Sequence, residues 1–222
     1  MSDSALLDNY YEPVEKDERL SLRPGRLAWA PVTYLEDELV SAKISETVPS
    51  DDSKTTFEVS VYEPDTNPDP PVKSIGLRSS EKIRVARMKV RPVIVMSSRV
   101  DGWTDRHGER VRKSTPARLV APLYTAEPYG AAFVERVQRF EYNSHFWLPA
   151  NEYPGGKPDR PCLVRLELAG AVREKMIQPV HFRLNEESYT YLRAWFDYFL
   201  DGEHGEISKL LAELYEAPTA SD

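Results

Sequence analysis

Apolar and polar residues alternate along several stretches of the chain, as they do in strands that bury one face. In residues 55–62, for example, Phe57, Val59 and Val61 fall on one side of an extended backbone and mostly polar residues on the other. The stretches that we predict to be strands are residues 25–34, 55–62, 82–90, 93–96, 118–124, 132–140, 145–148 and 162–168. Short strands separated by turns are typical of a β-barrel or a β-sandwich, so we expect a mainly β fold.

Helical periodicity is confined to the C-terminal part of the chain. Asn185 is a suitable N-cap, and two glutamates follow it, where carboxylates suit the positive end of the helix dipole. Apolar residues then recur at spacings of three and four from Tyr189 to Phe199, which places them in one stripe. Gly202 is a suitable stop, and we predict a shorter helix over residues 207–215. We expect both apolar stripes to pack in the core or in a dimer contact.

The composition is that of an ordinary globular protein, with 41% hydrophobic and 29% charged residues among 222. No apolar run approaches the roughly 20 residues that a membrane-spanning helix needs, and the acidic N-terminus lacks the layout of a secretory signal. We therefore expect a cytoplasmic protein that makes no membrane contact. Cys162 is the only cysteine, which excludes an intramolecular disulfide and indicates a buried, inert thiol.

The net charge of −7 hides a basic middle segment. Residues 78–118 carry 12 Lys and Arg against 4 Asp and Glu, whereas residues 1–77 carry 7 against 16 and residues 119–222 carry 10 against 16. Such a segment is typical of a site for a polyanion, and equally of a solvated face paired with the acidic flanks. The four histidines show no metal-ligand spacing, so we predict neither a metal nor another cofactor.

Three segments, in chain order, resemble the MazF/PemK family of toxin ribonucleases. Residues 25–29 (GRLAW) are similar to the family's opening glycine, polar residue and apolar strand. Residues 91–97 (RPVIVMS) are similar to its Arg-Pro motif followed by a buried strand. Residues 119–125 (LVAPLYT) are similar to its later apolar strand, which ends near a threonine. Nearly half of the chain lies outside the resemblance.

The resemblance implies a mostly antiparallel SH3-like barrel of the MazF/PemK/CcdB type with helices at its C-terminal end, usually a symmetric homodimer. It also implies metal-independent cleavage of single-stranded RNA, with an acidic, partly disordered antitoxin as protein partner. Residues 1–20 are polar and acidic without a clear period, so we expect a flexible acidic arm there, and the resemblance implies a single barrel domain over residues 21–202. We expect an insertion in this domain at about residues 35–80, and a short helix and tail over residues 203–222.

The resemblance also implies a site for the scissile phosphate, formed in the family by the arginine of the Arg-Pro motif and a threonine that ends the later strand. Arg91 matches the arginine. Tyr124 stands at the position of the threonine and Thr125 follows it, so Thr125 moves in through a bulge, or the Tyr124 phenol substitutes, or the site is inactive. An acidic residue of the family falls at Ala86. Arg91 also fits the simpler interpretation of a strand-end arginine paired with a carboxylate.

Further residues near this motif are candidates for substrate binding. They are Arg87, Lys89, Trp103, His107, Arg112 and Lys113. The last four lie in a polar loop expected over residues 97–114. Aromatic residues mixed with basic ones suit single-stranded nucleic acid, and a solvated loop with one anchoring tryptophan fits the same residues.

Two hypotheses of different classes follow. The first is a MazF/PemK-like endoribonuclease, the toxin of a toxin–antitoxin pair, in which Arg91 stabilises the phosphate and Thr125 or Tyr124 assists. The second is a catalytically inactive barrel that binds protein or nucleic acid, and it is motivated by Tyr124 and Ala86 at the two catalytic positions. A third idea is that the acidic residues of segment 1–20 cover the basic middle segment as a built-in RNA mimic.

Overall fold

The structure, a computed structural model, describes residues 9–33, 40–46, 56–61, 83–98, 116–202, 205 and 209. The chain divides into two units, one formed by Met1–Val32 with Val90–Asp222 and the other by Thr33–Lys89. Each unit is described by itself below. The division into an arm, a barrel domain with an insertion, and a tail stays a prediction.

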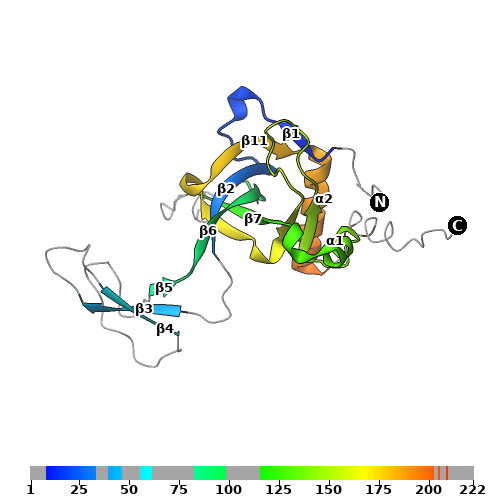
Figure 1. Cartoon of the computed structure of the whole chain (residues 1–222). Coiled ribbons are helices and arrows are strands. Elements are labelled where there is room, and N and C mark those ends of the chain that lie inside the picture. The colour runs from blue at the N-terminus through cyan, green and yellow to red at the C-terminus, as the bar shows by residue number, and fades with distance from the viewer. Residues whose placement is uncertain are drawn as a thin grey trace, which may run out of the picture. The chain divides into compact units, whose positions relative to one another are not determined.

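A mainly antiparallel sheet of eight strands forms the larger unit (Figure 1). Its strands lie in the order β1-β11-β2-β6-β7-β9-β8, and β10 pairs with β7. Their bounds are β1 (Tyr11–Pro13), β2 (Arg26–Thr33), β6 (Met88–Val95), β7 (Ala117–Thr125), β8 (His145–Leu148), β9 (Cys162–Arg165), β10 (Gly170–Arg173) and β11 (Gln178–Leu184). The helices are α1 (Ala131–Gln138) and α2 (Glu186–Asp201), with single 3₁₀ turns η1 (Lys16–Glu18), η4 (Glu127–Tyr129), η5 (Leu166–Leu168) and η6 (Glu174–Met176). Among the described residues, no strand pairing closes the sheet into a barrel.

Strand β7 is paired along both of its edges and contacts three other strands of the sheet. On one edge it pairs with β6, with Val93 opposite Pro122 and Val95 opposite Val120. On the other edge, the second half of β7 pairs with β9 and the first half with β10. Because only η5 and one further residue separate β9 from β10, the two short strands follow β7 as one interrupted strand.

Side chains of β6 and β7 alternate between the two faces of the sheet, and many are buried on each face. On one face, Ile94 and Leu123 belong to the larger hydrophobic cluster, which also contains Trp195 of α2. On the other face, Val93 and Val120 belong to a second cluster with small residues of β2. Since full burial of one such side chain contributes about 1.5–3 kcal/mol, both clusters stabilise the register of this strand pair.

Helix α2 has the ends that the sequence predicts. The Asn185 side chain accepts a hydrogen bond from the backbone N–H of Ser188 at 2.7 Å, and Gly202 adopts a left-handed φ of 69° beyond the last turn. The apolar stripe of α2 packs in the larger cluster, and the Trp195 indole donates a hydrogen bond to the carbonyl of His145 at 3.0 Å. The shorter helix predicted over residues 207–215 lies, apart from residue 209, outside the described part of the chain.

The strand predicted over residues 132–140 is wrong, because this segment forms helix α1. Its alternating pattern is also compatible with a helix, since Phe133 and Val137 are four residues apart and share one helical face. That face packs in a small cluster with Ala126 and Leu163. Burial of these side chains, which depends on the tertiary structure, therefore decides between the two interpretations.

Most of the other predicted strands are confirmed, although some bounds differ. The prediction over residues 25–34 corresponds to β2, and those over residues 118–124 and 145–148 correspond to β7 and β8. The stretch predicted as one strand over residues 82–90 is interrupted, and residues 166–168 form η5 where a strand was expected. The pattern missed β10 and β11, which are short or contain isolated polar residues.

The second unit contains a three-stranded antiparallel sheet in the order β4-β3-β5. Its strands are β3 (Val40–Glu46), β4 (Thr56–Val61) and β5 (Ile83–Val85). Strand β4 confirms the prediction over residues 55–62. Strand β3 was not predicted, because its segment is rich in polar residues.

Residues 1–20 were predicted to form a flexible arm, and from Asn9 onward the described part of this segment lies against the sheet. Strand β1 pairs with the edge of β11, and Tyr11 is only 2% exposed in the larger cluster. The acidic residue Glu12 forms an ion pair with Arg183 of β11. Hydrophobic burial of the tyrosine and this pairing hold the segment on the sheet, and Glu12 is paired with an arginine that lies outside the basic middle segment.

The cap of α2 leads to a prediction about stability. Asn185→Ala removes the oxygen that accepts from Ser188, and also a hydrogen bond that the Asn185 side chain donates to the Asn9 carbonyl. We expect the free energy of unfolding to fall by about 1 kcal/mol or slightly more, measured by urea denaturation. Asn143→Ala, at an exposed turn position, is the matched control and should change it little. Equal stability of the two variants would contradict the role of the cap.

Candidate functional site

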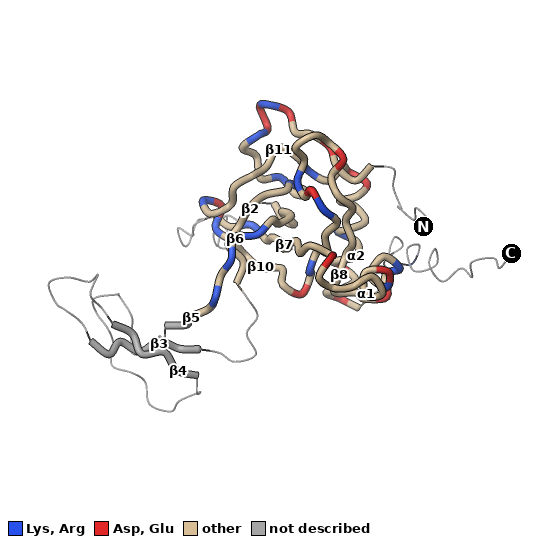
Figure 2. Tube along the Cα trace, viewed as in Figure 1, with Lys and Arg blue, Asp and Glu red and all other residues tan. Residues whose placement is uncertain are grey.

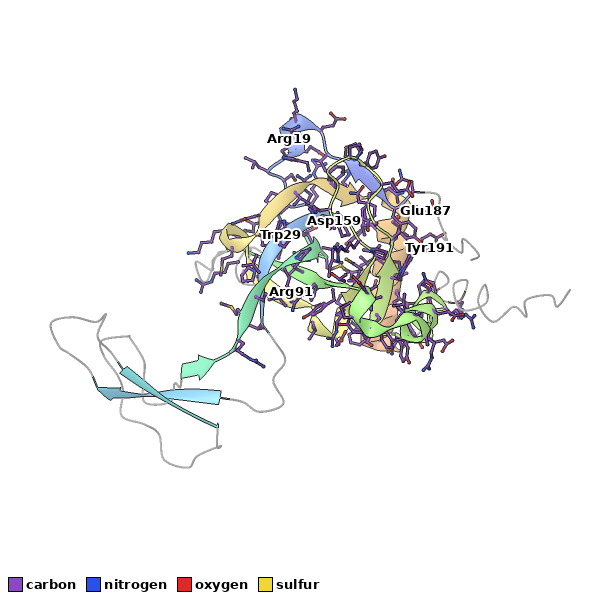
Figure 3. All side chains as sticks on the ribbon, in the orientation of Figure 1. Arg19, Trp29, Arg91, Asp159, Glu187 and Tyr191 are labelled. Carbon is purple, nitrogen blue, oxygen red and sulfur yellow. The ribbon has the colours of Figure 1, made fainter. Side chains whose placement is uncertain are left out.

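Strands β6 and β7 bring together two residues that the sequence analysis placed at a phosphate site. Val93 lies opposite Pro122 in this antiparallel pair. Arg91 is two residues before Val93 and Tyr124 is two residues after Pro122, so the register places Arg91 opposite Tyr124. The guanidinium carbon of Arg91 lies 4.2 Å from the centre of the Tyr124 ring, a cation–π contact. Both side chains are half-buried, and Figure 3 shows Arg91 on the β6 ribbon. The contact keeps a cation and a phenol in fixed relation at the surface of the sheet.

A second arginine approaches the same ring from β9. Tyr124 lies opposite Leu163, and Arg165 is two residues farther along that strand, on the same face. Its guanidinium carbon lies 5.2 Å from the centre of the Tyr124 ring. Two positively charged groups from different strands thus converge on one tyrosine.

Glu167 fixes the position of Arg165. The Arg165 Nε donates a hydrogen bond to the Glu167 carboxylate at 2.6 Å, and an Nη nitrogen lies 2.5 Å from the same oxygen. Burial by itself would lower the pKa of Arg165, but the hydrogen bond and charge of Glu167, together with the nearby Tyr129 hydroxyl, outweigh it, so the pKa is raised. The guanidinium therefore stays charged although its side chain is only 29% exposed.

Aromatic side chains of α1 and its flanks continue this face of the sheet. The Tyr129 and Phe133 rings are stacked with centres 5.5 Å apart, and Phe133 is stacked on Tyr142 at 4.9 Å. The guanidinium of Arg136 lies over the Tyr142 ring at 4.6 Å. These rings are all half-buried, so each leaves part of its surface accessible.

His145 lies beside this group. It stands opposite Arg165 in the β8–β9 pair, and its ring meets the edge of Phe133 at 5.5 Å. Burial lowers the pKa of His145, Glu167 raises it and Arg165 lowers it, with a net decrease. The imidazole is therefore neutral near pH 7 and makes a hydrogen-bonded contact with the Ser144 hydroxyl at 2.9 Å.

Thr125 is not part of the Arg91–Tyr124 contact. Thr125 pairs with Cys162 in the register that already places Tyr124 opposite Leu163, so no bulge occurs at this point. Successive strand residues point to opposite faces, and Thr125 therefore projects away from the face that carries Tyr124. It lines a separate pocket of about 620 Å³ between the end of β7 and α1, with Trp147 and Arg160 among the other lining residues.

The remaining predicted residues stay predictions, although Lys89 lies on β6, two residues before Arg91. Arg87 and Lys89 are exposed and belong to the second unit. Trp103, His107, Arg112 and Lys113 lie outside the described residues. Sequence reasoning missed Arg165, and an arginine within an otherwise apolar strand was the available signal.

Several general features bear on the chemistry of the chain. Basic and acidic positions are interspersed along the trace of the larger unit (Figure 2). Cys162 is buried, as predicted, and burial raises the pKa of its thiol to about 11, which disfavours a reactive thiolate. In the part of the chain that the structure describes, no three His, Cys, Asp or Glu side chains are grouped so that they could hold a metal ion. Within the same residues, no helix has the length and apolar character needed to cross a bilayer.

A scan against models of protein families, a search of curated proteins and a search of solved structures each found no match to this chain.

The lowered pKa of His145 leads to a prediction about pH dependence. The unfolded chain binds the proton at a higher pH than the native protein does, so the contribution of His145 to stability is complete above about pH 6.5. It is lost as the pH falls through that value toward the lower native pKa. His145→Gln should therefore reduce the decrease in the free energy of unfolding between about pH 7 and pH 5.5.

Urea denaturation at several pH values measures this effect. His181→Gln, at an exposed position of β11, is the matched control. For each variant, the slope of the free energy of unfolding against pH is compared with that of the unmodified chain. A slope in His145→Gln equal to that of the unmodified chain would contradict the burial of a neutral imidazole.

Proposed function

We propose that this chain is a metal-independent endoribonuclease of the MazF/PemK type that cleaves single-stranded RNA. The observation that carries the proposal is the 4.2 Å contact between the Arg91 guanidinium and the Tyr124 ring, with Arg165 on the same ring at 5.2 Å. Arg91 and Tyr124 are far apart in the sequence and were assigned to the phosphate site by resemblance alone. Their contact at neighbouring strand positions supports this assignment.

The reaction needs no group from outside the RNA and the protein. The 2′-hydroxyl oxygen attacks the adjacent phosphorus, the bond from phosphorus to the 5′-oxygen breaks, and the 2′-hydroxyl proton is transferred to the departing 5′-oxygen. The products are a 2′,3′-cyclic phosphate and a free 5′-hydroxyl. The phosphate gains negative charge in the transition state, and donors that are already in place stabilise this charge without reorganisation.

Arg91 and Arg165 suit this task because a guanidinium stays charged and its planar donors match phosphate oxygens. Each is held in advance: Arg165 by Glu167, and Arg91 by its contact with Tyr124 and by Pro92, which favours an extended backbone before it. The Tyr124 hydroxyl can donate a further hydrogen bond to the phosphate. One preorganised donor of this kind contributes about 2.7–4 kcal/mol to transition-state stabilisation.

The proposal includes a small SH3-like barrel as the finer description of the fold. The antiparallel pairings of β7 with β6 and with β9 and β10 support it. The pairing of β11 with β2 also supports it, because it joins a strand from the C-terminal part of the chain to one from the N-terminal part. It also includes a cytoplasmic location, which is expected from the sequence, and a homodimer and an acidic antitoxin partner, which come with the resemblance.

A second candidate function is RNA binding without cleavage. Ala86, at the position of the family's acidic residue, has no group that can transfer a proton. The Tyr124 ring, engaged by two arginines, also forms a platform that binds phosphates and bases without any catalytic step. The first experiment below separates the two functions.

Arg91→Ala should abolish most of the cleavage. Purified protein is incubated with mixed-sequence single-stranded RNA in the presence of a chelator, and the fragment ends are mapped. We expect discrete cuts with 5′-hydroxyl ends, and a rate about 10²–10³ lower in Arg91→Ala because one charged donor is lost. Arg23→Ala removes an exposed arginine outside the site and is the matched control. Circular dichroism verifies that both variants are folded.

The outcomes of this experiment are distinct. Full cleavage activity in Arg91→Ala would show that Arg91 takes no part in the reaction. RNA that is bound and stays intact with the unmodified chain would favour the binding function over the ribonuclease. RNA that is neither bound nor cut would exclude both functions.

Tyr124→Phe tests the role of the phenol. The substitution retains the ring that contacts the two arginines and removes only the hydroxyl, so kcat should fall about 10²-fold while KM changes little. Tyr191→Phe on α2, which also removes one hydroxyl, is the matched control and should retain full activity. An unchanged kcat in Tyr124→Phe would show that the hydroxyl takes no part in the reaction.

A further inference from the structure

Arginine and aromatic side chains form a continuous series of contacts that leads from Arg91 to helix α1, and we propose that this series is a binding track for single-stranded RNA beside the cleavage site. We name it the arginine–aromatic track. Its members are Arg91, Tyr124, Arg165, Tyr129, Phe133, Tyr142 and Arg136. The inference rests on the proposed function for the position of the scissile phosphate, but RNA binding along the track does not require cleavage.

Each member of the track contacts the next. Beyond Arg165, the Tyr129 hydroxyl lies close enough to the guanidinium to help raise the pKa of Arg165. The stacked rings of Tyr129, Phe133 and Tyr142 then lead to the guanidinium of Arg136, at 4.6 Å from the Tyr142 ring. The track therefore has a cation at each end, another cation within it, and rings between them.

The members come from separate elements of the larger unit. Arg91 is on β6, Tyr124 on β7, Arg165 on β9, Tyr129 on η4 and Arg136 on α1. A surface of this kind exists only in the folded chain. It also differs from the basic middle segment of the sequence, which supplies Arg91 alone to the track.

The chemistry of the track suits a single nucleic-acid strand. Unpaired bases stack on aromatic rings and on guanidinium planes, while the N–H edges of arginines bind the phosphates between the bases. Double-stranded nucleic acid offers no free base faces for such contacts. All the rings are half-buried, so they are held by the fold and retain accessible surface.

The two carboxylates near the track position its cations. Glu141 accepts a hydrogen bond from the Nε of Arg136 at 2.6 Å, and Glu167 does so for Arg165. A guanidinium has more N–H donors than one carboxylate oxygen can accept, so both arginines retain capacity for phosphate oxygens. This arrangement is typical of a site in which arginines are oriented before the anion binds.

Helix α1 offers a closely matched pair of arginines for a test. Arg136 and Arg139 have side chains that are 54% and 55% exposed, and each is paired with a glutamate, Glu141 and Glu135 respectively. Only Arg136 contacts an aromatic ring of the track. Alanine substitution removes the same charge in both cases, so any difference between them reports the track and not the net charge.

The probe is a mixed-sequence 2′-O-methyl RNA oligonucleotide, which lacks the attacking hydroxyl and cannot be cleaved. Its affinity for the full chain is measured by fluorescence anisotropy at several salt concentrations. Arg136→Ala should weaken binding about tenfold and reduce the slope of log affinity against log salt by about 0.7, because one phosphate contact is lost. Arg139→Ala should change neither value.

Tyr142→Leu tests the stacking part of the track. It should weaken binding roughly 5- to 100-fold with little change in the salt slope, since a stacking surface is lost and no charge. Tyr142→Phe keeps the ring and should restore most of the affinity. Thermal unfolding verifies that each variant is folded, and Tyr142→Phe also controls for loss of packing around Phe133.

The results separate the track from the ribonuclease. Equal affinities of Arg136→Ala and Arg139→Ala would overturn the track, whatever the outcome for cleavage. Weaker binding by Arg136→Ala and Tyr142→Leu would support the track even if the unmodified chain leaves ordinary RNA intact. An unmodified chain that does not bind the probe would overturn the track, and cleavage of ordinary RNA is scored independently.

Discussion

The pairing of β7 along both of its edges is the constraint on which the rest of the structure depends. One edge holds β6 and the other holds β9 and β10, so residues from three parts of the chain are fixed at neighbouring positions. The same register turns Leu123 into the core beside α2 and turns Tyr124 toward Arg91 and Arg165. A shift of one residue would exchange the two faces, and would destroy the core and the site together.

The elements at the ends of the chain stabilise this register. Helix α2 covers the core face, and the indole of Trp195 is hydrogen-bonded to the backbone of β8. Strand β1 extends the sheet beyond β11 and buries Tyr11, whose hydroxyl donates a hydrogen bond to the Pro149 carbonyl at 2.6 Å. Because the core face is covered in this way, the opposite face can carry half-buried arginines and tyrosines without a loss of order.

The electrostatics of the site arise from the fold more than from the charge of any one segment. The net charge is −7, yet arginines from β6, β9 and α1 lie along one series of aromatic rings. Within the basic middle segment, Arg118 has a structural role instead, since it is hydrogen-bonded to Glu174 beside β10. Local charge in the sequence is therefore a weak guide to where an anion can bind.

The sequence by itself determined the features that depend on neighbours along the chain. Alternation located β4, apolar runs and turn residues located β2, β7 and β8, and the Asn185 cap and Gly202 stop located α2, because such patterns and caps are set within a few residues. Only the tertiary structure decided that residues 131–138 form a helix, that the segment after Asn9 joins the sheet, and that Arg165 meets Tyr124. These features depend on which distant surfaces bury a face or complete a strand edge, and that information is absent from any short window of sequence.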